Sequence, residues 1–173
     1  METPKYFFQY RDDAQKLFLR EYVYTLGTFH YNWHDEIELL VILRGRADIC
    51  TGGCVYQLEE DDMILINSNE GHATLARSAD CLAFLIRFSP TVFEAYDANY
   101  RALRFQLLTD SSSRSQLPYR LLRMYMTKML LAMETDEQKN LLQMQSGLYP
   151  LLELLQSQFR QTASGKSSIS SSR

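Results

Sequence analysis

The stretch GTFHYNWHDEIELLVILRG, residues 27–45, carries the strongest structural signal in this sequence. Its second half, Ile37 to Leu43, is almost wholly apolar and predicts a buried β-strand. Side chains alternate between the two faces of a strand, so a strand that began earlier would place five polar groups on one face. These groups are His30, Asn32, His34, Glu36 and Glu38. They cannot lie unpaired in a dry core, so either this face lines a wet pocket or part of the stretch is an irregular loop.

Further strand signals surround this stretch. Five of the seven glycines lie between residues 27 and 71, and glycine supplies the positive φ angles of tight turns. Two of them, Gly52 and Gly53, predict a hairpin turn. The segments with strand character are 17–25, 37–43, 47–50, 55–58, 63–66, 73–77 and 82–88. Short strands at this regular spacing predict a sandwich or barrel over residues 1–110.

Residues 111–160 have a helical pattern instead. From Gln116 onward, apolar side chains recur at the three- and four-residue spacing of helices, on more than one face. We therefore expect a helical pair that is covered on two sides, by the barrel and by another helix or another subunit. Pro150 lacks a backbone donor and predicts a kink or break near residues 147–150. Ahead of the pair, residues 104–107 are expected to return as a strand.

The net charge of −3 is unevenly distributed along the chain. Residues 1–110 carry 10 basic and 17 acidic side chains, whereas residues 111–173 carry 8 and 4. Nucleic-acid affinity depends on basic side chains that neutralise phosphates, so we expect the first 110 residues not to contact DNA. Residues 161–173 are rich in serine and predict a linker toward a further domain that this chain lacks.

Composition and motifs exclude several other classes of protein. Apolar residues make up 46% and charged residues 23%, which is typical of a globular domain. No apolar run approaches the roughly 18 residues of a membrane span, and no signal peptide is apparent. Three cysteines without an export signal predict a cytoplasmic protein. Nucleophile-elbow, phosphate-loop and dinucleotide-binding motifs are also missing, so we expect no enzyme activity.

Two motifs resemble those of cupins, and more narrowly those of the N-terminal sensor domain of AraC-type bacterial transcription regulators. The first cupin motif is a His-x-His pair, a Glu after three or four residues and a Gly six residues later. Here the same spacing runs through Asn32, His34, Glu38 and Gly45. The second is DDMILINSNEGH, residues 61–72, which resembles the "Gly-Asp, apolar run, Asn-Pro-Asn-Glu-x-His" of many AraC-type sensors. The resemblance covers roughly residues 15–160.

This resemblance implies a cupin-type double-stranded β-helix barrel followed by an antiparallel helical pair. It further implies an effector pocket in the barrel, a homodimer through the helical region and a helix-turn-helix domain, absent here, that binds DNA. We expect the effector to be a sugar or a related small metabolite. The side chains expected to bind it are His34, Glu38, His72, Asn32, Tyr22, Tyr24 and Arg87. Arg87 could equally extend to solvent from its apolar strand.

The first motif departs from that of metal-binding cupins, because Asn32 stands where they have a histidine. We therefore expect no metal cofactor. A metal, if present, would be held by His34, Glu38 and His72, with His30 as a fourth ligand. Two alternatives to the sensor remain open. One is a stand-alone metal-dependent cupin enzyme that acts on a small sugar or carbonyl substrate, and the other is an assembly module with a closed barrel.

Several other side chains have more than one interpretation. His34 and Glu38 could form a purely structural pair. Trp33 alternates out of phase with the polar set, so we expect a core or dimer contact rather than a sugar platform. Cys50 and Cys54 flank the predicted hairpin turn, and we expect them to be small strand residues rather than a redox or metal pair.

Overall fold

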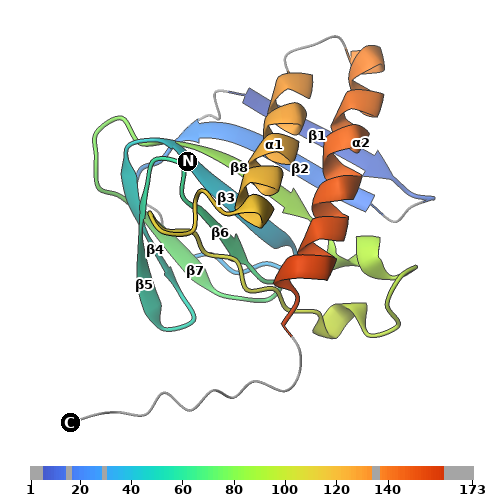
Figure 1. Ribbon diagram of the computed structural model, residues 1–173, viewed down its shortest axis with the longest axis horizontal. Coiled ribbons are helices and arrows are strands. Elements are labelled where there is room, and N and C mark those ends of the chain that lie inside the picture. Colours follow the sequence, from blue (N-terminus) through green and yellow to red (C-terminus); the bar gives the residue numbers. More distant parts are fainter. Residues whose placement is uncertain (1–5, 15–16, 29–30, 134–136, 162–173) are drawn as a thin grey trace.

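Two antiparallel sheets form the first part of the chain (Figure 1). The structure, a computed structural model, describes residues 6–14, 17–28, 31–133 and 137–161. The larger sheet has the strand order β1-β2-β8-β3-β6 and the smaller one β5-β4-β7. The strands are β1 (Tyr6–Asp12), β2 (Leu17–Thr25), β3 (Ile37–Arg44), β4 (Arg46–Thr51), β5 (Cys54–Glu59), β6 (Met63–Ile66), β7 (His72–Ala76) and β8 (Leu82–Phe88).

The central strand β3 is buried on both faces of the larger sheet, which explains why it is apolar almost throughout. Leu40 and Ile42 face the smaller sheet and pack there with Ile49 and Leu58. Leu39, on the opposite face, belongs to the core beneath the helices. One continuous apolar run therefore supplies two separate cores, one between the sheets and one between the larger sheet and the helices.

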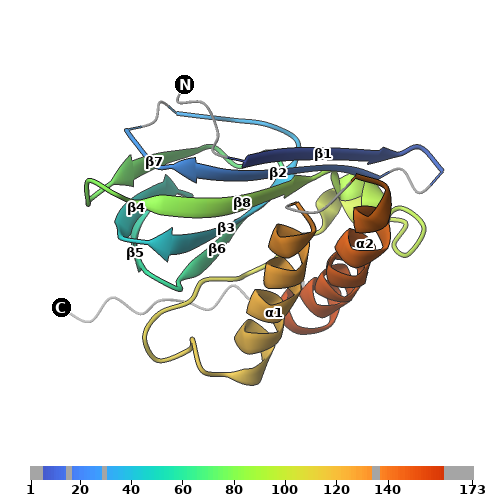
Figure 2. The same ribbon diagram turned by 90° about the horizontal axis from the view of Figure 1, so that it is seen from above.

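Two helices, α1 (Leu117–Ala132) and α2 (Glu137–Leu154), lie side by side against the outer face of the larger sheet (Figure 2). They approach closely at Gly147, where an added Cβ would lie 2.7 Å from the Tyr125 carbonyl oxygen and 2.7 Å from Met129 Cγ. Helix α2 continues through Pro150 and ends in a π-helical turn, Leu155–Phe159, so the chain does not break there. Short 3₁₀ turns, Pro90–Phe93 and Tyr100–Ala102, connect β8 to the helical region.

Residues 104–109 extend the larger sheet beyond β6. The Leu65 amide donates to the Leu107 carbonyl at 3.0 Å, and the Thr109 amide donates to the Met63 carbonyl at 2.9 Å. The expected return strand over residues 104–107 is therefore present as an irregular edge.

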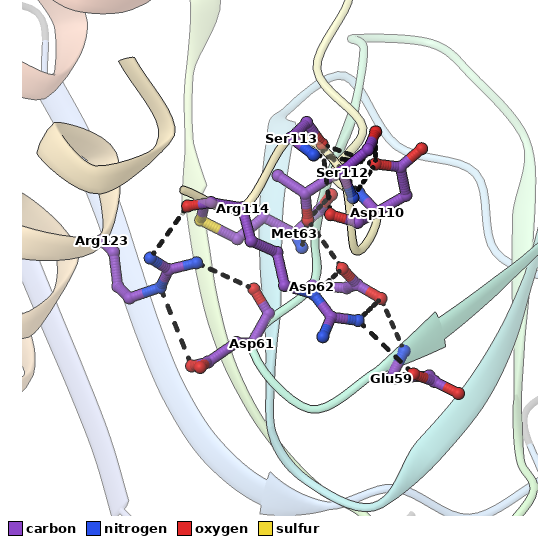
Figure 3. Close-up of polar contacts among 10 residues, drawn as sticks. Glu59, Asp61, Asp62, Met63, Asp110, Ser112, Ser113, Arg114 and Arg123 are labelled. Atoms are coloured by element: carbon purple, nitrogen blue, oxygen red, sulfur yellow. Dashed lines mark hydrogen bonds and ion pairs between the residues drawn. The ribbon is translucent and has the colours of Figure 1, made fainter. Parts of the chain in front are cut away.

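A polar contact, which we call the Asp62 clasp (Asp62, Thr109 and Arg114), fixes the far end of this edge (Figure 3). Arg114 Nε and Nη2 donate to the two oxygens of Asp62 at 2.7 and 2.8 Å. Thr109 donates to the same carboxylate at 3.2 Å. Beside it, Arg123 of α1 donates to the Asp61 carbonyl at 3.3 Å. The turn between β5 and β6 is thus tied to the segment that leads into α1.

The mainly β fold with a C-terminal helical pair confirms the fold predicted from the sequence. One strand, β1, was not predicted. The region before β3 also differs from a continuous strand, because residues 33–36 lie outside any strand and Asn32 forms only an isolated bridge with His72. Among the described residues, neither helix is both long and apolar enough to cross a membrane.

Candidate functional site

Glu38 is the centre of a polar cluster on the inner face of the larger sheet. Its Oε2 atom lies 2.7 Å from Arg87 Nε, 3.2 Å from His34 Nε2 and 3.6 Å from His72 Nε2. The four residues come from β3, β8, β7 and the loop before β3. Strand register explains part of this convergence, since Glu38 and Arg87 are paired positions of neighbouring strands.

The two histidines are oriented by backbone carbonyl groups. His34 Nδ1 lies 3.2 Å from the Glu36 carbonyl oxygen, and His72 Nδ1 lies 3.2 Å from the Glu70 carbonyl oxygen. A carbonyl can only accept a hydrogen bond, so each Nδ1 carries a hydrogen and each Nε2 is directed toward Glu38. The rings meet edge to face with their centroids 5.1 Å apart. The backbone therefore presents both Nε2 atoms to one point.

Charge in the cluster favours an ionised Glu38. Burial alone would raise the pKa of this carboxyl group, but the hydrogen bond with His34 and the charges of Arg87 and His72 hold its pKa below the ordinary value. Burial, together with the negative charge of Glu38, raises the pKa of the Tyr24 hydroxyl, so that group stays neutral. The site thus offers a carboxylate acceptor beside guanidinium and phenol donors.

The cluster reaches solvent at its edge. The side chains of His34 and Arg87 are 17% and 23% exposed, whereas those of Glu38 and His72 are nearly inaccessible. Arg87 also lies over the Tyr22 ring, 5.9 Å from its centroid, and so covers one of the two predicted tyrosines. A small molecule at the edge would meet His34 and Arg87 before it met Glu38.

A second ion pair adjoins the cluster and was not predicted. Arg20 is paired with Arg87 across the sheet, and its Nε donates to Glu36 Oε1 at 3.2 Å. Glu36 is buried although it was counted among the polar groups of a possible strand face. The strand period could have revealed Arg20, because it lies on the same face of β2 as Tyr22 and Tyr24.

The structure brings together most of the predicted site residues, but not all of them. His34, Glu38, His72 and Arg87 converge, with Tyr22 and Tyr24 on the same face of the sheet. Asn32 is exposed, and its backbone pairs with that of His72 at 2.7 and 2.9 Å. His30 lies outside the described residues.

Trp33, Cys50 and Cys54 occupy exposed positions. Trp33 is 64% exposed, and its indole N–H donates to the Asn69 carbonyl at 3.2 Å. Of the two positions expected for Trp33, the core is therefore wrong, because the alternation on which it was based applies only within a strand. The dimer contact stays a prediction. Cys50 pairs with Val55 and Cys54 with Thr51, so the two thiols lie on opposite faces of the hairpin and are both free.

Three side chains of the cluster are of the types that bind a divalent metal ion. One ligand atom each from His34, Glu38 and His72 lies within 4.8 Å of the others, and all three are ligand types of Zn²⁺, Fe²⁺ and Mn²⁺. The carbonyl contacts of both Nδ1 atoms are typical of metal-binding histidines. Arg87, however, already places a positive charge 2.7 Å from the oxygen that would bind the ion. The three side chains are therefore suitable ligands for a metal ion, but the Glu38 carboxylate already has a positively charged partner in Arg87.

Solved structures with local similarity include cupins. A conserved protein of unknown function from Streptococcus pyogenes is 21% identical, with a TM-score of 0.38 over 43% of this chain and 65% of that one. The Cnp3 cupin domain of Schizosaccharomyces pombe is 8% identical, with a TM-score of 0.40 over 48% and 62%. A cupin protein from Bacteroides fragilis is 20% identical, with a TM-score of 0.37 over 41% and 64%. The chain thus spans less than two thirds of each of these structures.

Sequence comparison gives a more extensive match. No curated protein sequence matches the chain. The family profile described as AraC-like ligand binding domain, by contrast, matches residues 16–152, which include β2 to β8, α1 and most of α2. This agrees with the resemblance that the two motifs indicated. The chain therefore belongs to the family of AraC-like ligand binding domains.

Proposed function

We propose that this chain is the effector-sensing and dimerisation domain of a cytoplasmic AraC-type transcription regulator. The observation that supports this function best is the Glu38 cluster, in which one buried carboxylate oxygen faces a guanidinium and two imidazoles at a solvent-accessible edge. A small effector binds there and favours one conformation of the domain. The helical region passes this bias to a helix-turn-helix domain outside this chain, which binds the DNA.

The chemistry of the cluster supports a polyhydroxylated effector, a sugar or a related metabolite. Glu38 accepts hydrogen bonds, while Arg87 and the tyrosines donate them, and a sugar hydroxyl can do both. Each of the two buried carboxylates already has an arginine partner, because Arg87 faces Glu38 and Arg20 faces Glu36. A neutral ligand can enter without leaving an unpaired buried charge.

The helical region supports a homodimer. Leu117, Met124 and Leu131 are exposed, and their seven-residue spacing places them in one stripe along α1. Such a stripe on a second copy would cover them. We expect Met124→Glu to convert a dimer to a monomer in analytical ultracentrifugation, whereas Gln143→Glu, at an exposed position of α2, leaves the mass unchanged. A wild-type monomer at micromolar concentration would contradict this part of the proposal.

Effector binding is tested by thermal shift against a panel of sugars and metabolites. A specific ligand raises the melting temperature with the logarithm of its concentration. Arg87→Lys should weaken that ligand at least tenfold, because lysine cannot keep the planar contact with Glu38 while it binds the ligand. A flat response of the wild-type protein across the panel would argue against the proposal.

The matched control is Arg77→Lys. Arg77 Nε donates to the buried Asp48 carboxylate at 2.7 Å, the same distance as in the Arg87–Glu38 contact, but Arg77 follows β7 directly and Asp48 lies on β4 of the smaller sheet. This variant should bind the effector as the wild type does. Equal loss in both variants would show that the effect arises from stability rather than from the site.

The spacing of His34, Glu38 and His72 favours one alternative, a metal-dependent cupin enzyme that acts on a small sugar or carbonyl substrate. In such an enzyme the three residues would hold the ion, which would act as a Lewis acid on the substrate. Elemental analysis of the purified protein tests it. One transition metal per chain in the wild type, lost in His72→Ala, would replace the sensor proposal with this one.

A further inference from the structure

The cluster is connected to the C-terminal end of the described chain through a series of hydrogen bonds. Residues 159–161 pair with residues 104–106 as a short antiparallel ladder. The Gln106 amide donates to the Phe159 carbonyl at 2.8 Å, and the Gln161 amide donates to the Arg104 carbonyl at 2.9 Å. The segment that follows α2 is therefore held against the edge of the larger sheet.

The side chain of Asn67 holds this edge at its other side. The Phe105 amide donates to Asn67 Oδ1 at 2.8 Å, and Asn67 Nδ2 donates to the Phe105 carbonyl at 3.0 Å. This is the pattern of a backbone peptide in an antiparallel ladder, supplied by a side-chain amide just beyond the end of β6. Only a group with one donor and one acceptor at this position can form both bonds.

Asn67 is also bonded to the loop that precedes His72. Its backbone N–H and its Nδ2 donate to Glu70 Oε2 at 3.2 and 3.3 Å. The Glu70 carbonyl oxygen is the acceptor that orients the His72 ring, and His72 Nε2 faces Glu38. A displacement of His72 therefore acts on Glu70, and through it on Asn67.

The Asp62 clasp holds the other end of the same edge (Figure 3). Asp62, Thr109 and Arg114 fix the far end of the edge, next to the Thr109–Met63 backbone bond. The near end, residues 104–106, is held to the larger sheet by Asn67. Residues 104–106 can therefore shift when the cluster changes, while Thr109 stays in place.

We propose that Asn67 couples the Glu38 cluster to the pairing of residues 104–106 with residues 159–161. This inference rests on the proposed function, since it describes how an occupied site would change the segment that follows α2. Asn67 acts here as a positioning residue that need not touch the effector. Simple proximity does not establish coupling, so the test must measure non-additivity.

The test is a double-mutant cycle read by amide hydrogen exchange with NMR. Glu38→Gln perturbs the cluster without any ligand. Asn67→Asp keeps the shape of the side chain but removes its donor to both Phe105 and Glu70. We expect Glu38→Gln to speed exchange of the Gln106 and Gln161 amides by roughly threefold and Asn67→Asp by roughly tenfold. In the Asn67→Asp background, Glu38→Gln should add almost nothing. The Thr109 amide should not change with Glu38→Gln.

Controls separate coupling from a general loss of stability. Asn69→Asp makes the same change two residues along the loop, at an exposed position whose amide donates to Ser68, and should leave the effect of Glu38→Gln intact. His34→Ala serves as a second perturbation at the exposed edge. Equal effects of the cluster variants with and without Asn67, or no effect on Gln106 and Gln161 from either variant, would overturn the inference. Because the cycle uses no ligand, a failed effector screen does not affect its outcome.

Discussion

Two buried glutamates on opposite faces of the larger sheet have opposite surroundings. Glu38, on the inner face, has Arg87 and two histidines around one oxygen, and its pKa is lowered. Glu21 lies on β2 between Leu19 and Val23 on the face that packs beneath the helices. Among the described residues, neither oxygen of Glu21 has a hydrogen-bond partner, and burial raises its pKa to about 8.

The comparison shows that burial alone does not decide the charge of a carboxyl group in this fold. Both side chains are almost inaccessible to solvent, so the difference in ionisation arises from their partners. The inner face has the donors and cations that a binding site needs. The outer face has an apolar core into which one carboxyl group fits only when it is neutral. A single substitution, Glu→Met, applied at three positions tests this explanation.

Glu21→Met should give the largest effect, and it should stabilise the protein. Since the folded-state pKa is above the ordinary 4.5, the unfolded chain releases its proton first and stability falls as the pH rises from 4.5 to about 8. The gain on substitution should be about 4 kcal/mol at pH 8 and below about 1 kcal/mol at pH 4.5. Urea denaturation at several pH values measures it. A gain that does not depend on pH would contradict an ionisable Glu21 as its cause.

Glu38→Met should instead destabilise the protein. We expect a loss of about 3 kcal/mol in the free energy of unfolding at pH 7, because the substitution leaves Arg87 without its buried partner. The folded-state pKa of Glu38 is below 4.5, so its contribution is present at neutral pH and is lost as the pH falls below that value. The cost of the substitution should therefore shrink in acid. If Glu38→Met were as stable as the wild type at pH 7, the cluster would not be an electrostatic unit.

Glu36→Met should give the smallest effect. Glu36 is buried, and among the described residues its carboxylate has one partner, Arg20, whose side chain is 31% exposed and regains water when the pair is lost. A loss of about 1 kcal/mol is expected from such a partly exposed pair. The same denaturation series measures it. A loss as large as that of Glu38→Met would mean that the number of partners does not determine the ranking.

Much of the fold and part of the site could be predicted from local patterns. The apolar run of β3, the glycines of the hairpin and the helical spacing all depend on neighbours within a few residues. The strand β1 was missed although its sequence, YFFQYRD, is rich in the aromatic residues that strands favour. Asp61 stands where the family motif has a glycine, and its φ of 71° lies in the left-handed region that favours glycine.

The rest of the site depends on long-range contacts that no spacing reveals. The Asn67–Phe105 contact joins residues that are 38 positions apart in the sequence. Trp33 is exposed because β3 begins only at Ile37, so Trp33 lies in the loop before the strand. Arg87 was a candidate for binding and also for simple exposure to solvent. Its orientation toward Glu38 became clear only when the register of β3 and β8 was known.

The close contact of the helices at Gly147 limits how a signal can travel. Because α1 and α2 touch where there is no space for even a methyl group, the two helices cannot slide past each other without a clash between their backbones. We therefore expect the two helices to move together, so that a movement at the end of α2 also shifts the exposed stripe on α1.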